Sequence, residues 1–142
     1  MPGGALEALA ATSSWDKTLL LARFALEKKA CDLVVMEVRE LTTIADYFII
    51  CSGRSDRQVQ SIAQGIEENL SDAGHPPLSI EGATRGHWVL MDFADVIVHI
   101  FYEPVREFYD LDGLWGHAPR VELPEPYSTL ADQFQTADNQ GL

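Results

Sequence analysis

The segment 46–52 (DYFIICS) constrains the fold more than any other part of the sequence, because it is almost continuously apolar. A strand of this composition is buried on both faces, so it is expected near the centre of a sheet. The longest apolar run, residues 96–102, is also only strand-sized and contains His99. No apolar run approaches the roughly 20 residues that a membrane-spanning helix needs, so the sequence predicts no membrane span.

The spacing of apolar residues and the positions of capping residues divide most of the chain into helices and strands. The predicted order is a helix at 14–30, strands at 33–38 and 46–52, a helix between Ser55 and Gly74, strands at 78–81, 87–92 and 95–101, and a short helix from Pro104. This order predicts an α/β fold, a single domain in which helices flank a mixed five-stranded sheet.

The chain has 142 residues, which is enough for one domain of ordinary size. Residues 1–12 are rich in Gly and Ala and are expected to form a flexible leader. Residues 13–117 carry the periodic pattern and form the predicted domain. Residues 118–142 lose this periodicity and contain three prolines among scattered acids, so we expect an acidic, mobile tail.

The two cysteines, Cys31 and Cys51, are too few for a disulfide framework and have no C-x-x-C spacing. Both are expected to be small buried residues in a reducing compartment. The N-terminus lacks the basic and apolar regions of a secretory signal and the Arg-rich character of a transit peptide. A cytoplasmic location is therefore expected.

The net charge of −12, from 22 acidic and 10 basic residues, constrains the kind of partner. Binding along a nucleic-acid groove requires the opposite sign, so little or no direct nucleic-acid binding is expected. An acidic protein can instead dock on a basic protein. The charge is uneven, because residues 92–142 carry ten acids and two arginines, a net charge of −8. The alternative is that the acidity serves solubility alone.

The last two strands suggest a hairpin whose tight turn is Phe93-Ala94. On one face this turn predicts Trp88 opposite His99 and Leu90 opposite Ile97, with Phe101 extending the face. The other face is purely aliphatic and is expected to pack on the helices; its residues are Val89, Met91, Val96, Val98 and Ile100. A face that mixes Trp, His and Phe is typical of a partner-binding hot spot, and the alternative is that both faces are buried.

Two short motifs could serve phosphate chemistry, and neither is complete. The turn 52–55 (SGRS) lies where a strand meets a helix and could hold an anion on backbone N–H groups. It lacks the full phosphate-loop pattern and Asp56 would repel phosphate, which favours a helix cap. Asp92 and Asp95 could hold Mg²⁺, but their D-x-x-D spacing spans a turn, which favours turn solvation or charge offered to a basic partner.

The histidines and cysteines show no catalytic or metal-ligating pattern. His75, His87, His99 and His117 lack metal-ligand spacing. No G-x-S-x-G motif occurs, and neither cysteine has a histidine at a diagnostic spacing. The residues themselves therefore predict a binding domain that is not an enzyme and has no cofactor and no metal.

Three sequence blocks follow one another in a specific order. They read ADYFIICSGRSDRQVQSIA from Ala45, EGATRGHWVLMDFADVIVHIF from Glu81, and REFYDLDGLW from Arg106. Over roughly residues 15–116 this arrangement closely resembles the Iojap-like family, the ribosomal silencing factors (RsfS). The W-V-x-x-D-x-x-D-V-I-V-H and Y-x-L-x-x-L-W segments are the most diagnostic, whereas the leader and the acidic tail fall outside the resemblance.

The resemblance implies a fold similar to that of nucleotidyltransferases, without their catalytic residues. It also implies binding to the large ribosomal subunit, on ribosomal protein L-fourteen at the face that meets the small subunit. Family members thereby block subunit joining and repress translation when nutrients are scarce, and they are often dimers when free. The residues alone leave two other functions open, a nucleotide-binding or nucleotidyltransferase-like enzyme and a homodimeric scaffold module.

Carried over residue by residue, the resemblance implies a partner-binding surface of twelve side chains. These are Trp88, Asp92, Asp95, His99, Phe101, Tyr102, Glu103, Arg106, Tyr109, Leu111, Leu114 and Trp115. Within this set, Trp88 and Tyr109 are the expected anchors, and Asp92, Asp95 and Glu103 are the expected charge partners. The resemblance does not separate side chains that touch the partner from side chains that support them.

Overall fold

The computed structural model describes residues 13–136, so the leader expected at 1–12 lies outside the described residues. Its elements are α2 (Ser14–Glu27), β1 (Cys31–Glu37), β2 (Tyr47–Gly53), α3 (Asp56–Asp72), β3 (Ser79–Glu81), β4 (Trp88–Asp92), β5 (Val96–Tyr102), α4 (Glu103–Tyr109), α5 (Leu111–Leu114) and α6 (Tyr127–Asp132). The predicted α/β class and five-stranded mixed sheet are confirmed. Within 13–136 no helix is long and apolar enough to cross a membrane.

The strand order in the sheet is β1-β2-β5-β4-β3, with β2 and β5 at its centre. These two strands run parallel over their whole length, from Tyr47 opposite Val96 to Gly53 opposite Tyr102. Every residue of β2 is buried, which confirms the central position predicted from its apolar composition. The other three strand pairs are antiparallel.

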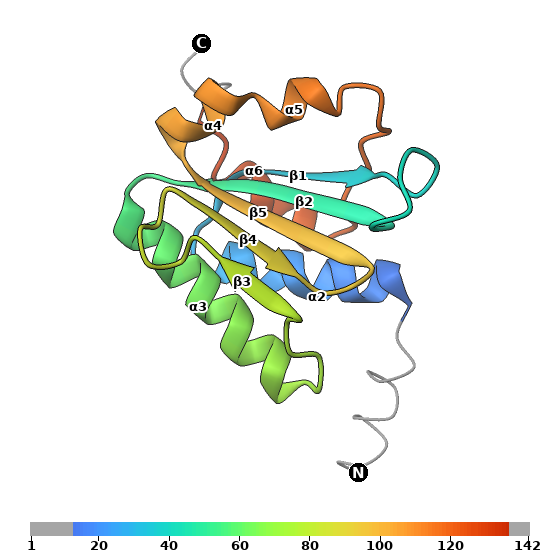
Figure 1. Cartoon of the computed structure of the whole chain (residues 1–142), viewed down its shortest axis with the longest axis horizontal. Coiled ribbons are helices and arrows are strands. Elements are labelled where there is room, and N and C mark those ends of the chain that lie inside the picture. The colour runs from blue at the N-terminus through green and yellow to red at the C-terminus, as the bar shows by residue number, and fades with distance from the viewer. Residues whose placement is uncertain (1–12, 137–142) are drawn as a thin grey trace.

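Helices cover the two faces of the sheet unequally (Figure 1). The long helices α2 and α3, together with α6, pack on one face and enclose the larger apolar core. The short helices α4 and α5 lie on the other face, over a second and smaller core. The larger core contains the aliphatic hairpin face, as predicted, and the second core contains Trp88, Leu90, Ile97 and Phe101.

Local signals in the sequence explain where the long helices begin. Ser13 accepts a hydrogen bond from the backbone N–H of Asp16, and Ser55 accepts one from Gln58. Each caps its helix as the sequence predicts. Cys31 and Cys51 are free and buried, and burial raises the pKa of the Cys51 thiol to about 12. Both cysteines therefore behave as small apolar residues.

The predicted register of the β4–β5 hairpin is wrong by two residues. Trp88 lies opposite Phe101, and Leu90 lies opposite His99. The turn residues are Ala94 and Asp95, because the Phe93 N–H donates to the Val96 carbonyl. The Asp92 carboxylate accepts the N–H of Ala94, which has a left-handed φ of 75°. A shift of two residues preserves the facing of every side chain, so the assignment of the two faces is correct.

The segment 118–136 packs on the domain, which differs from the mobile tail expected there. Met36 pairs with Arg120, the Glu37 N–H donates to the Pro119 carbonyl, and the Val121 N–H donates to Val35. The reason is that β1 is an edge strand whose outward backbone groups need partners. The loss of periodicity and the prolines signalled an irregular segment, and such a segment can still cover an edge.

We predict that Ala131→Asp loosens this segment, because Ala131 of α6 is buried in the larger core. A carboxylate at this position has no partner, which should lower the free energy of unfolding by about 2 kcal/mol. Urea denaturation measures the loss, and amide exchange at Val121 should become faster. The control is Gln133→Asp, at an exposed position just beyond α6. Equal stability of the two variants would contradict the docking of α6.

Candidate partner-binding surface

The layer formed by α4 and α5 is placed directly by the central strand β5, since α4 begins at the residue after Tyr102. Pro104 lies in the first turn of α4, where backbone N–H groups have no partner within the helix, so the missing N–H of proline costs no hydrogen bond. Asp110 separates the two helices in a left-handed conformation, and its carboxylate accepts the N–H of Gly113. The two helices therefore turn sharply and remain over the second core.

Arg106 ties this layer to the sheet. Its guanidinium binds both carboxylate oxygens of Asp112, at 3.1 and 2.8 Å, and donates to the Ser52 hydroxyl at 2.9 Å and the Asp32 carbonyl at 2.8 Å. Burial alone would raise the pKa of Asp112, but the hydrogen bonds and charge of Arg106 outweigh it, and that pKa is lowered. Arg106 therefore holds α5 and the ends of β1 and β2 together.

An aromatic cluster lies at the end of the hairpin next to α4. The Trp88 ring stacks on Phe101 with centroids 4.8 Å apart and lies 5.0 Å from the Tyr109 ring. The indole Nε1–H donates to Nδ1 of His99 at 3.2 Å, so this histidine nitrogen acts as the acceptor. Burial disfavours the charged imidazole and lowers the pKa of His99 to about 4. His99 therefore remains neutral at physiological pH and orients Trp88.

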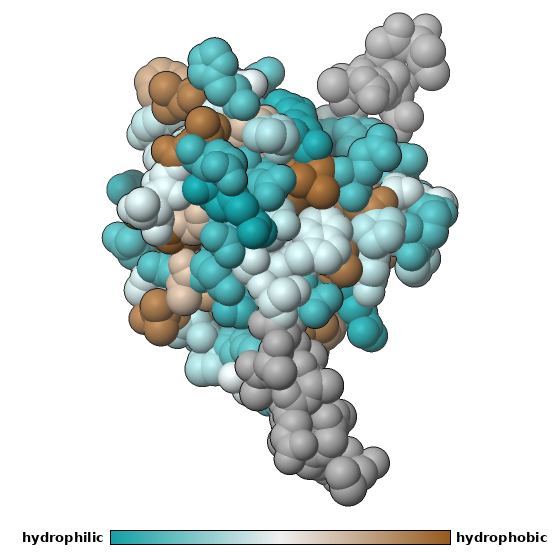
Figure 2. Space-filling view, turned by 90° about the vertical axis from the view of Figure 1, so that its right-hand side faces the viewer, coloured by the Kyte–Doolittle hydropathy of each residue, from teal (hydrophilic) through white to brown (hydrophobic). Residues whose placement is uncertain are grey.

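Beyond this cluster, α4 and α5 expose apolar side chains. Phe108 is 82% exposed, Tyr109 is 50% exposed and Leu114 is 74% exposed. Trp88, Phe108 and Tyr109 form what we call the exposed aromatic surface. Beside it runs a groove of about 450 Å³ that is lined by Gly82, Arg85, His87, Trp88, Pro104, Val105, Phe108 and Tyr109. The side of the molecule in Figure 2 instead shows small hydrophobic areas separated by hydrophilic ones.

The structure brings only part of the predicted surface together. Tyr109 and Leu114 are exposed on α4 and α5, and Trp88 of β4 is half-buried next to Tyr109. Trp115 is half-buried against Phe48, with ring centroids 4.8 Å apart. His99, Phe101 and Leu111 are buried, so these three can only support the side chains above them.

Other predicted members lie elsewhere or have internal partners. Asp92 and Asp95 are at the turn end of the hairpin, away from the aromatic cluster, and Asp95 forms an ion pair with Lys17 at 2.7 Å. Tyr102 packs against the larger core on the opposite sheet face, and Glu103 lies 3.9 Å from Arg54.

Phe108 is the exposed residue that the predicted site omits. It is adjacent to Tyr109 in a helix of only seven residues, and the two rings meet edge-on at 5.1 Å. A short helix over a narrow core cannot bury two consecutive aromatic residues, because they point about 100° apart around the helix. The adjacency of Phe108 and Tyr109 was therefore the sequence signal that at least one of the two rings is exposed.

The two motifs considered for phosphate chemistry serve the fold. Ser52 binds Arg106, and Ser55 caps α3, which confirms the helix-cap interpretation of the 52–55 turn. Within the described residues no group of three or more His, Cys, Asp or Glu side chains could hold a metal ion. The arrangement suits recognition of another molecule through apolar and charged contacts.

Comparison with known proteins decides the family. The sequence matches the family model described as "Ribosomal silencing factor during starvation" over residues 11–141. The chain belongs to this family. The match extends through most of the segment that follows residue 117, beyond the range over which the resemblance was first apparent.

Several ribosomal silencing factors are similar to this chain. The factor from Bacillus subtilis is 40% identical over 97 residues, which cover 68% of this chain and 82% of the relative. The chloroplastic Iojap protein of Zea mays is 38% identical over 107 residues, covering 73% of this chain and 45% of the relative. A crystal structure of a Bacillus halodurans protein has a TM-score of 0.66 at 37% identity, and it covers 75% of this chain and 98% of that one.

We predict that the buried His99 makes stability pH-dependent. Its pKa is about 4 in the folded protein and 6.5 in the unfolded chain, so the unfolded chain binds the proton more readily as pH falls. Lowering the pH from 7.5 to 5 should therefore reduce the free energy of unfolding by about 2 kcal/mol. Urea denaturation at both pH values measures this. His99→Gln keeps an acceptor for Trp88 and cannot titrate, so equal pH dependence in both proteins would contradict the assignment.

Proposed function

We propose that this protein binds the large ribosomal subunit through ribosomal protein L-fourteen, at the face that meets the small subunit, and so prevents subunit joining. Translation is thereby repressed when nutrients are scarce. The observation that carries the proposal is the exposed aromatic surface, on a layer that Arg106 ties to the sheet, in a chain that belongs to the ribosomal silencing factors. Aromatic side chains of this kind supply most of the binding energy in protein interfaces.

The charge of the same layer supports a basic protein as the partner. Residues 92–142 have a net charge of −8, and α4 and α5 carry three acids, Glu103, Glu107 and Asp112, against one cation, Arg106, which pairs with Asp112. Ribosomal proteins are usually basic, so opposite charges would speed the encounter and favour one orientation. Trp88 and Tyr109 would then be the anchors, with Leu114 and Trp115 beside them.

The proposed inhibition requires no chemical step. A folded domain of this size on a subunit interface excludes the other subunit sterically, so the protein acts as a translational repressor and not as an enzyme. Because the small subunit and this protein would compete for the same face of the large subunit, the outcome depends on the amounts of the two competitors. Repression would therefore increase when the factor is abundant or when few ribosomes are translating.

The proposal places the protein in the cytoplasm, where its target would be assembled. Free copies would pair as homodimers, and the exposed aromatic surface is an apolar area that such a dimer could cover. If the dimer uses this surface, dimerisation and ribosome binding compete with each other.

We predict that the purified protein sediments with isolated large subunits and not with small subunits. Raising the salt concentration should weaken the association, because salt screens charge contacts between the acidic layer and a basic protein. Co-sedimentation at two salt concentrations measures both effects. Absence of the protein from both pellets would contradict the proposal and would favour a scaffold dimer.

We further predict that Tyr109→Ala weakens binding to large subunits by about 30-fold, which corresponds to roughly 2 kcal/mol for an anchor residue. Tyr109 is a cleaner test than Trp88, because truncating Trp88 would also remove its stacking on Phe101. Thermal unfolding should show little change in Tyr109→Ala. Unchanged affinity would remove the exposed aromatic surface from the proposed interface.

The chain offers a matched pair of leucines for the same question. Leu114 on α5 is 74% exposed, and Leu78, just before β3, is 72% exposed. Leu114→Ser should weaken binding to large subunits, whereas Leu78→Ser should not. Equal effects of the two substitutions would show that the α4–α5 layer is not the binding surface.

A further inference from the structure

The basic side chains of this acidic protein fall into two groups. Four form ion pairs at 2.7–3.2 Å, namely Lys17 with Asp95, Arg23 with Glu27, Arg39 with Glu37, and Arg106 with Asp112. The others form no such pair within residues 13–136: Lys28, Lys29, Arg57, Arg85 and Arg120 have no ion pair, and Arg54 reaches only 3.9 Å from Glu103. Most of this second group lies in one place.

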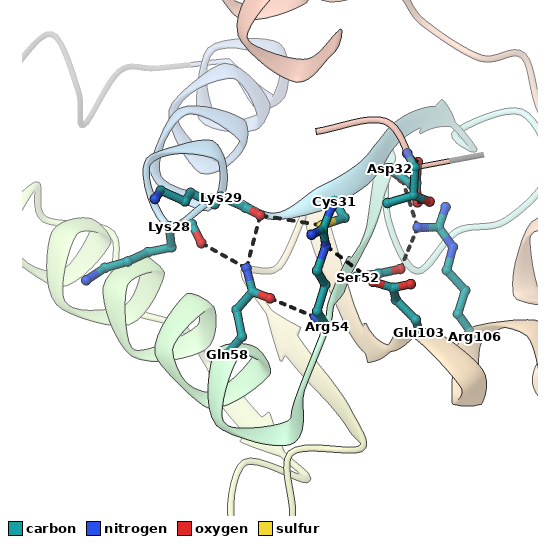
Figure 3. A network of polar contacts seen from close by, with 10 residues as sticks. Lys28, Lys29, Cys31, Asp32, Ser52, Arg54, Gln58, Glu103 and Arg106 are labelled. Carbon is teal, nitrogen blue, oxygen red and sulfur yellow. Dashed lines mark hydrogen bonds and ion pairs between the residues drawn. The ribbon is translucent and has the colours of Figure 1, made fainter. Parts of the chain in front are cut away.

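These residues lie on the first part of α3 or on segments that flank it: the end of α2, the end of β2 and the loop that carries Arg85. The Gln58 side chain donates to the carbonyls of Lys28 and Lys29, at 3.4 and 3.1 Å, and accepts the Arg54 N–H at 2.7 Å (Figure 3). One glutamine of α3 thus joins the end of α2 to the end of β2, with the Lys28 and Lys29 side chains on one side of it and the Arg54 side chain on the other.

The loop that carries Arg85 is fixed on the other side of α3. Gln60 donates to the carbonyls of Ala83 and Thr84, at 3.0 and 2.8 Å. Gly86 has a positive φ of 71°, and a Cβ there would lie 2.5 Å from the Asp56 carbonyl, so only glycine permits this close approach. We call Lys28, Lys29, Arg54, Arg57 and Arg85 the basic patch.

The side chains of the basic patch are presented to solvent by the fold. All five residues are exposed. Glu27 and Asp56 are their immediate neighbours in the sequence, Glu27 is paired with Arg23, and Glu103 lies 3.9 Å from Arg54. The Lys28 stem lies against Gly65, where a Cβ would be only 2.8 Å from the lysine Cε. Packing of this aliphatic stem on α3 leaves the ammonium group at the surface.

We propose that the basic patch binds the phosphate backbone of ribosomal RNA. The inference rests on the proposed function, since it assumes that the protein docks on the large subunit. Two classes of molecule cover a ribosome, basic proteins and RNA. A basic ribosomal protein suits the acidic α4–α5 layer and would be repelled by the basic patch, so the patch suits RNA phosphates.

The basic patch is continuous with the exposed aromatic surface. Arg85 lines the same groove as Trp88, Phe108 and Tyr109, and Arg54 lies beside Glu103 at the start of α4. A single docked position can therefore place the aromatic surface on protein and the basic patch on neighbouring RNA. The net charge of −12 argues against binding along a nucleic-acid groove, and it does not argue against a few local phosphate contacts.

The test reverses two charges in the patch and two elsewhere. Arg57→Glu with Arg85→Glu changes the patch, and Arg23→Glu with Arg120→Glu is the control, which changes the net charge by the same amount. The patch variant should bind isolated large subunits about tenfold more weakly. In a plot of log affinity against log salt concentration, its slope should be shallower than that of the wild type by about 2, because two phosphate contacts are lost. The control should bind like the wild type. Equal effects in both variants, or no effect in either, would overturn the proposal.

A second measurement distinguishes this proposal from the proposed function. Isotope-labelled wild-type protein is titrated with a short RNA duplex at low salt and followed by amide NMR. Shifts confined to residues 28–29, 54–57 and 85 are expected, and the patch variant should not show them. These shifts would support RNA binding even if large subunits fail to sediment the protein. Weakened subunit binding of the patch variant without RNA-induced shifts would indicate an acidic protein partner and overturn the RNA assignment.

Discussion

Parallel pairing of β2 with β5 is the constraint on which the rest of the structure depends. The two strands are seven residues long, pair over their full length and bury nearly every side chain. Because they are parallel, both end at the same edge of the sheet. One continues into α3 and the other into α4. The basic patch and the α4–α5 layer are therefore neighbours, although α3 and α4 lie far apart in the sequence.

Partly buried polar contacts fix the second layer in place beside the smaller apolar core. Arg106 reaches from α4 to α5, β2 and β1 through Asp112, Ser52 and the Asp32 carbonyl. Asp32 in turn binds Thr136 through its carboxylate, so the segment after α6 joins the same network. Removing a buried member of such a network leaves its partners unsatisfied. Arg106, which the resemblance includes in the partner-binding surface, thus holds that surface in shape.

Much of the fold could be predicted from local patterns, and the errors have physical causes. Serine caps and apolar spacing predict α2 and α3, and the facing of β4 and β5 is correct because side chains alternate along a strand. The predicted turn is wrong because Ala94, a residue without an evident preference for positive φ, adopts φ 75°. The Asp92 carboxylate accepts the Ala94 N–H, and Lys17 donates to the Phe93 carbonyl, so both stabilise this turn. The packed segment 118–136 was missed because edge pairing needs no periodicity.

The sequence by itself determined α2, α3 and the five strands, the two faces of the hairpin, the absence of a strong catalytic motif and the family resemblance, since each depends on residue type and short spacing. Only the tertiary structure decided which aromatic side chains remain exposed. Phe101 and Phe108 are equally apolar in the sequence, and one is buried while the other is 82% exposed. The tertiary structure also brings the residues of the basic patch to the segments around the start of α3. Exposure and charge proximity depend on packing between distant segments, which local patterns do not encode.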